Sequence, residues 1–187
     1  MGKIIVSENV TIDGVVQDPI GESAFDHSGW FNRLPGLDRE AWAAVLHEEA
    51  VRAAALLMGR RTYEWFVGAG WPSRTGAWAD RLRTLPKHVV ATDLRAPTWE
   101  NTTVVDSAGL KSLEADVDGD IVVYGSGRLV RTLFDVDLVD ELRLMVCPVV
   151  LGSGAGLFAG VTGELPMQLV DARTVGGALA LLTYRRP

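Results

Sequence analysis

The chain has 187 residues and a net charge of −6, with 48% of its residues hydrophobic and 22% charged. This length suits one domain over residues 1–187, and the acidic balance gives no reason to expect nucleic acid or an anionic membrane as a partner. The single cysteine, Cys147, excludes a disulfide within the chain and predicts a buried thiol. The chain begins directly with a strand-like segment and has no membrane-length apolar run, so we expect a soluble cytoplasmic protein.

The first part of the chain predicts a central strand followed by a long irregular segment. Residues 3–7 form a short apolar run, and Asp13-Gly14 is a turn signal. Residues 17–37 then contain prolines and glycines with aromatic residues between them. A loop of this length is either a cover over a ligand or a packed irregular excursion, and the sequence leaves both open.

The next segment predicts a helix, a strand and a second helix. Asp38 has the character of an N-cap, and apolar residues then fall on one helical face. Residues 54–58 predict a buried strand that ends at Gly59, directly before Arg60 and Arg61. Because arginines at a helix N-terminus oppose the helix dipole, a bound phosphate would resolve the conflict; a solvated basic helix end is the alternative.

The middle of the chain continues to alternate helix and strand, which favours a parallel sheet with helices on both faces. The sequence predicts a helix over 78–85, a buried strand over 87–91 that ends at Thr92-Asp93, a minor strand over 103–105 and a short helix that contains Leu110 and Leu113.

Residues 120–134, DIVVYGSGRLVRTLF, carry the strongest functional signal. Residues 121–124 are too apolar for an exposed strand and too few for a helix, which indicates a strand buried on both faces. The Gly125-Ser126-Gly127 turn and a helix follow at once. Open amides at a helix N-terminus bind phosphate, and glycine lets a diphosphate approach the backbone. The turn therefore predicts a dinucleotide site, with an ordinary strand-to-helix connection as the alternative.

The last third of the chain predicts strands without intervening helices, over 139–150, 165–172 and 178–184, with a tight turn at 175–177. Such strands pair antiparallel. The expected fold is therefore an α/β mixed sheet, mostly parallel, with antiparallel C-terminal strands. The apolar character of these last strands also suggests a homodimer.

Four segments resemble the dihydrofolate reductase-like superfamily, and most closely the reductase domain of the bifunctional riboflavin-biosynthesis proteins. They are SENVTIDG from Ser7, MGRRTYE after a buried strand, VVYGSGRLVRTLF, and VDELRLMVCPVVLGSGAGLF, in that order. The resemblance extends over nearly the whole chain. It implies a single reductase-like domain with a nicotinamide dinucleotide cofactor.

The resemblance also implies cofactor-binding residues. Those implied to contact its phosphates, its adenosine end or the adenosine ribose are Gly59, Arg60, Arg61, Thr62 and Thr92, and those implied to hold the pyrophosphate are Gly125, Ser126, Gly127, Arg128 and Leu129. Asp93 stands where relatives that use NADPH often have a small hydroxyl residue, whereas the two arginines favour a 2′-phosphate. NADPH is expected, and NADH stays possible.

The substrate is expected to be a pyrimidine- or pteridine-like heterocycle. By resemblance Asp13 is the candidate for orienting it or relaying a proton, although a turn aspartate also has a structural role. Ser7 and Trp30 are further candidate substrate contacts. Trp30 is a candidate because an indole offers a flat face to a heteroaromatic ring. No acid of the first long helix is clearly in register to face a pterin, which argues against dihydrofolate reduction.

Two alternatives to a riboflavin-type reductase remain. One is dihydrofolate reductase activity, and the other is a non-catalytic nucleotide-binding module with the same fold. No zinc signature is present, and the deaminase domain that usually precedes this reductase is not expected, since one cysteine cannot make its zinc site. Every prediction that includes a dinucleotide requires two things of the turns at Gly59 and at residues 125–127. The turns must meet in space, and their amides must not already be capped by the protein's own side chains.

Overall fold

The computed structural model describes residues 2–187, and eight strands of this chain form one sheet in the order β4-β3-β2-β5-β1-β6-β8-β7. The strands are β1 (Lys3–Thr11), β2 (Ala55–Gly59), β3 (Lys87–Val90), β4 (Thr102–Val105), β5 (Asp120–Tyr124), β6 (Glu141–Cys147), β7 (Gln168–Val175) and β8 (Leu179–Arg185). β1 lies inside the sheet, as expected, with parallel partners on both sides.

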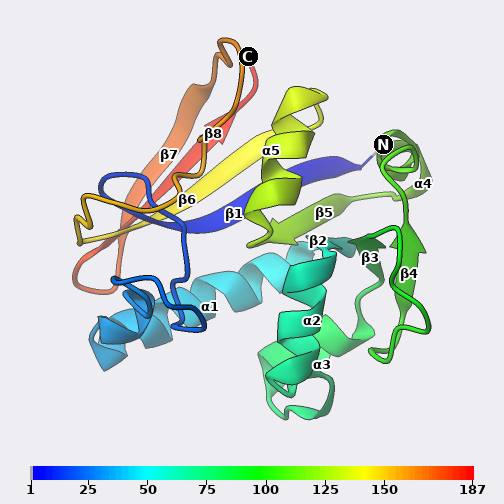
Figure 1. Cartoon of the computed structure of the whole chain (residues 1–187), viewed down its shortest axis with the longest axis horizontal. Helices are drawn as coiled ribbons and strands as arrows, with labels where there is room; N and C mark the ends of the chain where they lie inside the picture. Colours follow the sequence, from blue (N-terminus) through cyan, green and yellow to red (C-terminus); the bar gives the residue numbers. More distant parts are fainter. Residues whose placement is uncertain (1) are drawn as a thin grey trace.

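Helices cover both faces of the sheet, which confirms the predicted layering (Figure 1). The helices are α1 (Gly36–Arg52), α2 (Arg60–Gly68), α3 (Ala77–Thr84), α4 (Leu110–Asp116) and α5 (Gly127–Asp135), with short 3-10 helices η1 (Phe31–Arg33) and η2 (Trp71–Ser73). Apolar residues of α4 and α5 pack on one face, and those of α1, α2 and α3 pack on the other.

The order of the strands decides which loops meet. The chain passes from β1 to β2, β3 and β4 in one direction, and β5 then returns to lie between β2 and β1. All pairings among these strands and with β6 are parallel. The carboxyl ends of β2, β5 and β1 are therefore neighbours at one edge, where open α/β sheets bind ligands.

The C-terminal strands are antiparallel, as predicted, but their bounds differ from those expected. β6 stops at Cys147, before Pro148, because proline has no N–H to donate to a ladder. β7 begins at Gln168 rather than at residue 165.

Cys147 is fully buried, as predicted, and burial raises the pKa of its thiol to about 12.

The prediction that Asp38 caps α1 is wrong. The helix begins at Gly36 after Pro35, and Asp38 lies buried within its first turn. Its carboxylate instead accepts a hydrogen bond of 2.6 Å from the Gly177 N–H, in the turn between β7 and β8. Asp38 therefore fastens the start of α1 to the antiparallel end of the sheet, a contact over 139 residues that no local pattern signals.

The irregular segment after β1 is packed rather than open. Trp30 and Phe31 are buried with residues of β6 and β8 in a third apolar cluster. The Asp18 carboxylate accepts hydrogen bonds from the N–H groups of residues 21–23, which closes the loop on itself. The segment lies beside the glycine-rich loop of residues 148–167 in Figure 1, on the left of the view.

Among residues 2–187, no helix has both the length and the apolar character needed to cross a membrane.

Candidate functional site

The two glycine turns meet at the carboxyl edge of the sheet. The Gly59 N–H at the end of β2 donates a hydrogen bond of 3.0 Å to Ser126 Oγ in the turn after β5. The same hydroxyl donates to Thr62 Oγ1, in the first turn of α2, at 2.8 Å. The predicted convergence is therefore confirmed. The second requirement is not met at Gly59, because its N–H already donates to a protein side chain.

The turn after β5 has a backbone that few residues adopt. Gly125 has φ +60° and Ser126 has φ +68°, so two successive residues are left-handed. Glycine tolerates this conformation, whereas at a serine it is disfavoured and concentrates at functional sites. Because of this turn, α5 begins at Gly127, only three residues after β5 ends at Tyr124.

The N-termini of α2 and α5 are both open to an anion. Neither helix has a side-chain hydrogen bond at its N-cap, and neither has an acidic residue in its first turn. The first amides of each helix lack partners within the helix, and the dipole adds a positive potential there. Two such ends at one place suit a diphosphate.

Arginines surround these helix ends, but they are not equally free. Arg60 forms a 2.6 Å ion pair with Asp93, after β3, and lies 3.7 Å from Glu64. Within residues 2–187, Arg61 and Arg128 have no ion-pair partner. The structure therefore leaves two of the three cations available to phosphate.

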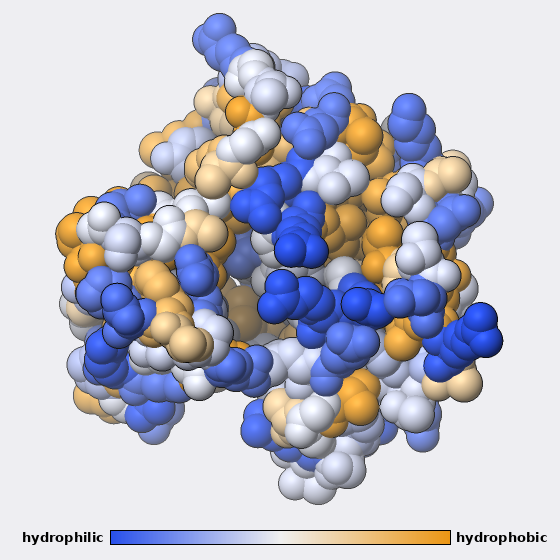
Figure 2. Space-filling view, viewed as in Figure 1, coloured by the Kyte–Doolittle hydropathy of each residue, from blue (hydrophilic) through white to orange (hydrophobic). Residues whose placement is uncertain are grey.

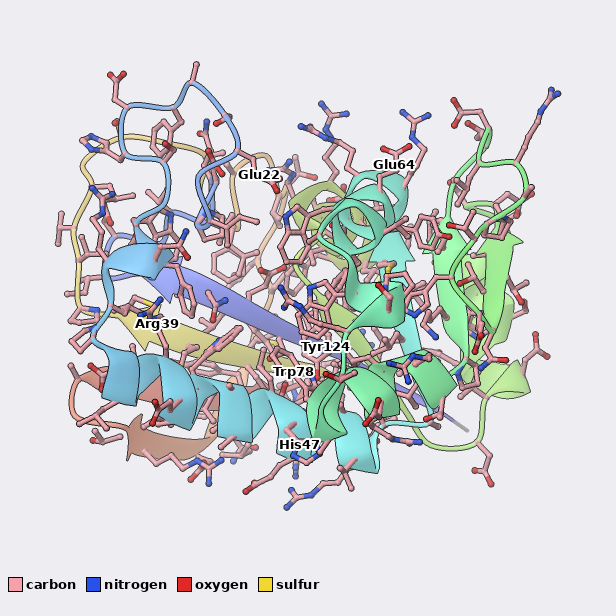
Figure 3. The ribbon with its side chains drawn as sticks, turned by 90° about the horizontal axis from the view of Figure 1, so that it is seen from below. Glu22, Arg39, His47, Glu64, Trp78 and Tyr124 are labelled. Carbon is pink, nitrogen blue, oxygen red and sulfur yellow. The ribbon has the colours of Figure 1, made fainter. Side chains whose placement is uncertain are left out.

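The space-filling view is hollowed near its centre, between the loops on the left and the start of α5 (Figure 2). Hydrophilic residues form most of the rim of this hollow. In Figure 3, Glu22 of the loop and Glu64 of α2 lie along the upper margin, with Tyr124 of β5 below them in the interior. In the shared view of Figures 1 and 2, the hollow lies near the point where β5 ends and α5 begins.

Two pockets elsewhere on the molecule are less suited to a dinucleotide. One of about 320 Å³ lies near the end of α5, around Phe134 and Arg186. The other, of about 280 Å³, lies between α1 and the antiparallel strands, around Glu49 and Arg143. Neither is lined by a helix N-terminus or a glycine turn, so we place the candidate site at the turns.

Asp13 holds the glycine-rich loop after β6. Its carboxylate accepts hydrogen bonds from the Thr11 hydroxyl at 2.6 Å and from the Gly152 N–H at 2.7 Å, with Leu151 N–H at 3.2 Å. The hydrogen bond from Thr11, followed by the bond from Gly152, lowers the pKa of Asp13 to about 2. The group is thus ionised at neutral pH and has no proton to give, which leaves orientation of a substrate as its predicted role.

The other predicted substrate contacts lie in the interior. Ser7 of β1 is buried on the face covered by α1, near Glu49. Trp30 is only 2% exposed, and its indole N–H donates to the Gln17 carbonyl at 2.9 Å. In this structure its ring packs within the protein, so stacking on a ligand would require the loop to move.

One acid of α1 does face the sheet, contrary to the expectation from helical spacing. Glu49 is buried, and burial raises its pKa. Its Oε1 lies 3.2 Å from Arg143 Nη1, and Arg143 also binds Glu141 at 2.6 Å. Glu49 is thus ion-paired with Arg143, and both line the pocket of about 280 Å³, which none of the glycine-turn residues lines. The acid therefore does not line the candidate site, which leaves the argument against dihydrofolate reduction in place.

The sequence reasoning missed Glu8. This β1 residue is 7% exposed, and its Oε1 has no hydrogen-bond partner in the described chain. The sequence does show an acid, Glu8, inside the strand-like run of residues 3–11. Asp13, in the turn that follows, was instead chosen as the candidate acid. No group of three or more metal-ligating side chains occurs among residues 2–187.

Comparison with solved structures shows the same fold. A protein from Shewanella sp. PV-4, provisionally assigned to riboflavin biosynthesis, aligns over 99% of both chains with a TM-score of 0.74 and 21% identity. RibD from Acinetobacter baumannii aligns over all of this chain and 58% of its own, with a TM-score of 0.70 and 15% identity. A pyrimidine reductase-like protein from Corynebacterium diphtheriae aligns over 98% of this chain and 91% of its own, with a TM-score of 0.64 and 11% identity.

Comparison of sequences points to the same group. The uncharacterised protein YyaP of Bacillus subtilis (strain 168) is 35% identical over 75 residues, which span 40% of this chain and 40% of YyaP. The family model described as RibD C-terminal domain matches residues 2–181. With the glycine turns, the strand order and this nearly full-length match in agreement, the chain belongs to the RibD C-terminal domain family.

Proposed function

We propose that this chain is a reductase that transfers hydride from NADPH, or from NADH, to a pyrimidine- or pteridine-like heterocycle. The proposed activity resembles that of 5-amino-6-(5-phosphoribosylamino)uracil reductase, an activity named for the Thermotoga maritima protein that shares this fold. The observation that supports the proposal is the meeting, at the Ser126 hydroxyl, of two helix N-termini whose N-cap residues form no side-chain capping hydrogen bond.

The residues at the turns suit a dinucleotide. A Cβ on Gly59 would lie 3.8 Å from Leu129 Cβ and from Ser126 Oγ, so a side chain there would extend into the space between the turns. The amides of Gly127, Arg128 and Leu129 begin α5 and are the natural donors to a diphosphate. Arg61 and Arg128 would neutralise its charge, since neither is bound to a carboxylate.

The dinucleotide would supply the hydride, and the protein would orient the substrate and exclude water. Asp13 is proposed to orient the substrate, or the loop that lines its site, through its ionised carboxylate. Its low pKa removes it as a source of protons at neutral pH. Thr92, which follows β3 close to the Arg60–Asp93 pair, is proposed to lie near the adenosine ribose.

Discrimination between NADPH and NADH is proposed to depend on Arg60 and Asp93. Their 2.6 Å ion pair means that a 2′-phosphate must compete with a carboxylate for the same guanidinium. Arg61 lies next in the helix and is not so engaged. We therefore favour NADPH, held with less discrimination than in a site without the carboxylate.

A nucleotide-binding module without turnover is the second candidate, and one observation favours it. Asp13, the acid first proposed to relay a proton, has a pKa lowered to about 2 and is ionised at neutral pH. Such a protein would bind the dinucleotide but would not oxidise it in the presence of any heterocycle. Dihydrofolate reduction is not favoured, because Glu49 is paired with Arg143.

We also propose that the chain forms a homodimer through its antiparallel edge. β7 is the last strand of the sheet, and all but its last residue are exposed. Leu169 and Val170 are exposed on it, and an open apolar edge strand is a template for pairing with another chain. Equilibrium sedimentation at micromolar concentration should give twice the chain mass, and a monomer would contradict the proposal.

Calorimetric titration with NADPH and with NADH tests the proposed function. We expect saturable binding of at least NADPH, and a loss of affinity of about 10- to 100-fold in Arg61→Ala, because a charge-assisted hydrogen bond is removed. Arg39→Ala, an exposed arginine on α1, is the matched control and should bind as the wild type does. Absence of saturable binding of both nucleotides would contradict the proposal, and binding without turnover on a heterocycle panel would favour the module.

A further inference from the structure

Glu8 is a buried acid with an unpaired carboxyl oxygen, Oε1. Its side chain is 7% exposed, and Oε1 forms no hydrogen bond within residues 2–187. Buried polar groups in native proteins are almost always hydrogen-bonded, because an unmade bond costs free energy. An acid kept in this state at a candidate site therefore calls for a function.

The strand register places Glu8 at the level of the two glycine turns. β1 pairs with β5 only as far as Ser7, opposite Tyr124, while its pairing with β6 continues to Thr11. Glu8 therefore lies one residue beyond the last β1–β5 pair, at the level where β5 ends and the turn at Gly125 begins. From Glu8 onward, the side of β1 that faces the turn has no strand partner.

Glu8 also lies on the same face of the sheet as the turns. Alternate residues of a strand share a face, and Val6 and Val10 pack with Leu129 and Val130 of α5. A Cβ on Gly59 would meet the same Leu129. The acid thus lies under the start of α5, next to the place proposed for the diphosphate.

The surroundings of Glu8 keep its carboxyl group neutral. The buried residues of β1, β6 and α5 on this face are apolar, and Arg128 at the start of α5 is exposed. Burial is the only cause that raises the pKa of Glu8, to about 8. At neutral pH the group is therefore a carboxylic acid, with one O–H donor and one carbonyl acceptor.

We propose that Glu8 pairs with the carboxamide of the nicotinamide ring when the dinucleotide is bound. A primary carboxamide has one acceptor oxygen and an NH₂ donor, so the acid O–H donates to the amide oxygen while the acid carbonyl accepts from the NH₂. This inference rests on the proposed function and deepens it by assigning the reducing end of the cofactor to β1. It gives a partner to the unpaired Oε1 of a buried acid.

The test combines three ligands with three proteins in binding titrations at pH 7. The ligands are NADPH, its reduced 3-acetylpyridine analogue, which lacks the NH₂ group, and 2′,5′-ADP, which lacks the ring. The proteins are the wild type, Glu8→Gln and Glu8→Leu. We expect Glu8→Leu to lose about 10-fold in affinity for NADPH. It should bind 2′,5′-ADP as the wild type does, and it should no longer prefer NADPH over the analogue.

The glutamine variant adds a second readout. Its amide also forms a paired contact with a carboxamide, so its affinity for NADPH should stay close to that of the wild type at pH 7. Above the pKa of about 8, wild-type affinity for NADPH should fall, whereas the affinity of Glu8→Gln should not change. This comparison holds even if the leucine variant does not fold.

The failures are distinguishable. If the wild type binds neither NADPH nor 2′,5′-ADP, the proposed function fails and the pairing fails with it. If the wild type binds NADPH but Glu8→Leu binds it equally well, or if wild type and Glu8→Gln share one pH profile, only the pairing is overturned. Selective loss of NADPH affinity with unchanged 2′,5′-ADP binding supports it.

Discussion

The hydroxyl of Ser126 accepts a hydrogen bond from the Gly59 N–H at 3.0 Å and thereby joins two strand-to-helix turns that are 67 residues apart in the chain. The same oxygen reaches Thr62 at 2.8 Å. One side chain therefore sets the spacing of the N-termini of α2 and α5. The geometry of the candidate diphosphate site depends on this contact.

Two substitutions separate the hydrogen bonds of Ser126 from its backbone strain. Ser126→Ala loses both bonds and keeps a left-handed residue, so we expect a loss of about 1–3 kcal/mol in the free energy of unfolding. Ser126→Gly loses the same bonds but relieves the positive φ, and should be about 1 kcal/mol more stable than the alanine variant. Chemical denaturation measures both. Ser107→Ala, at an exposed serine just before α4, should stay within about 0.5 kcal/mol of wild type. Equal stability of the alanine and glycine variants would contradict the strain argument.

Asp13 is expected to order the glycine-rich loop through its charge. Asp13→Asn leaves a weaker acceptor for the amides of Leu151 and Gly152, so hydrogen exchange at these two amides should become faster. Asp26→Asn, at an exposed position in the neighbouring loop, should leave both amides unchanged. Because the pKa of Asp13 is about 2, no activity change between pH 4 and pH 9 should follow its titration. A pH-rate step that disappears in Asp13→Asn would refute this assignment.

Asp93 is expected to weaken the preference for NADPH. Asp93→Asn removes a carboxylate near the proposed 2′-phosphate and frees Arg60 from its 2.6 Å ion pair. Exposed ion pairs contribute little, so the ratio of NADPH to NADH affinity should rise only about 2- to 10-fold. Parallel titrations with the two nucleotides measure the ratio. Asp80→Asn, which breaks an exposed pair with Arg83 on α3, serves as the control. An unchanged ratio would place the 2′ position elsewhere.

Glu8 is expected to make stability fall as pH rises. The native protein holds the Glu8 proton up to pH about 8, whereas the unfolded chain loses it near 4.5. Between these values the native state binds more protons, so the free energy of unfolding decreases with pH, by at most about 1.4 kcal/mol per pH unit. Glu8→Gln lacks this dependence. The stability difference between the two proteins should therefore shift in favour of Glu8→Gln from pH 5 to pH 8, and a constant difference would show that Glu8 ionises normally.

Much of the fold could be predicted from local patterns. The run at 121–124, the turn at Gly125 and the helix after it are determined by residues close in sequence, because strand burial, positive φ and helical spacing are short-range properties. The mixed sheet followed from strands that lack intervening helices. The resemblance of the same motifs to known proteins predicted the family, and the family model that matches residues 2–181 confirms it.

The partners of polar side chains could not be predicted in this way. Asp38 has the composition of an N-cap, yet its partner Gly177 is supplied by a turn 139 residues later. No acid of the first long helix was expected to be clearly in register, but Glu49 is buried and paired with Arg143 of β6. In each case a long-range contact outweighs a local preference of about 1 kcal/mol.

The sequence by itself determined the strand-turn-helix units, their glycine corners and the mixed character of the sheet, because these depend on neighbours within a few residues. Only the tertiary structure decided that Ser126 joins the two corners, that Asp13 binds the glycine-rich loop, and that Glu8 is buried with Oε1 unpaired. The physical reason is the insertion of β5 between β2 and β1, which brings together groups that are far apart along the chain.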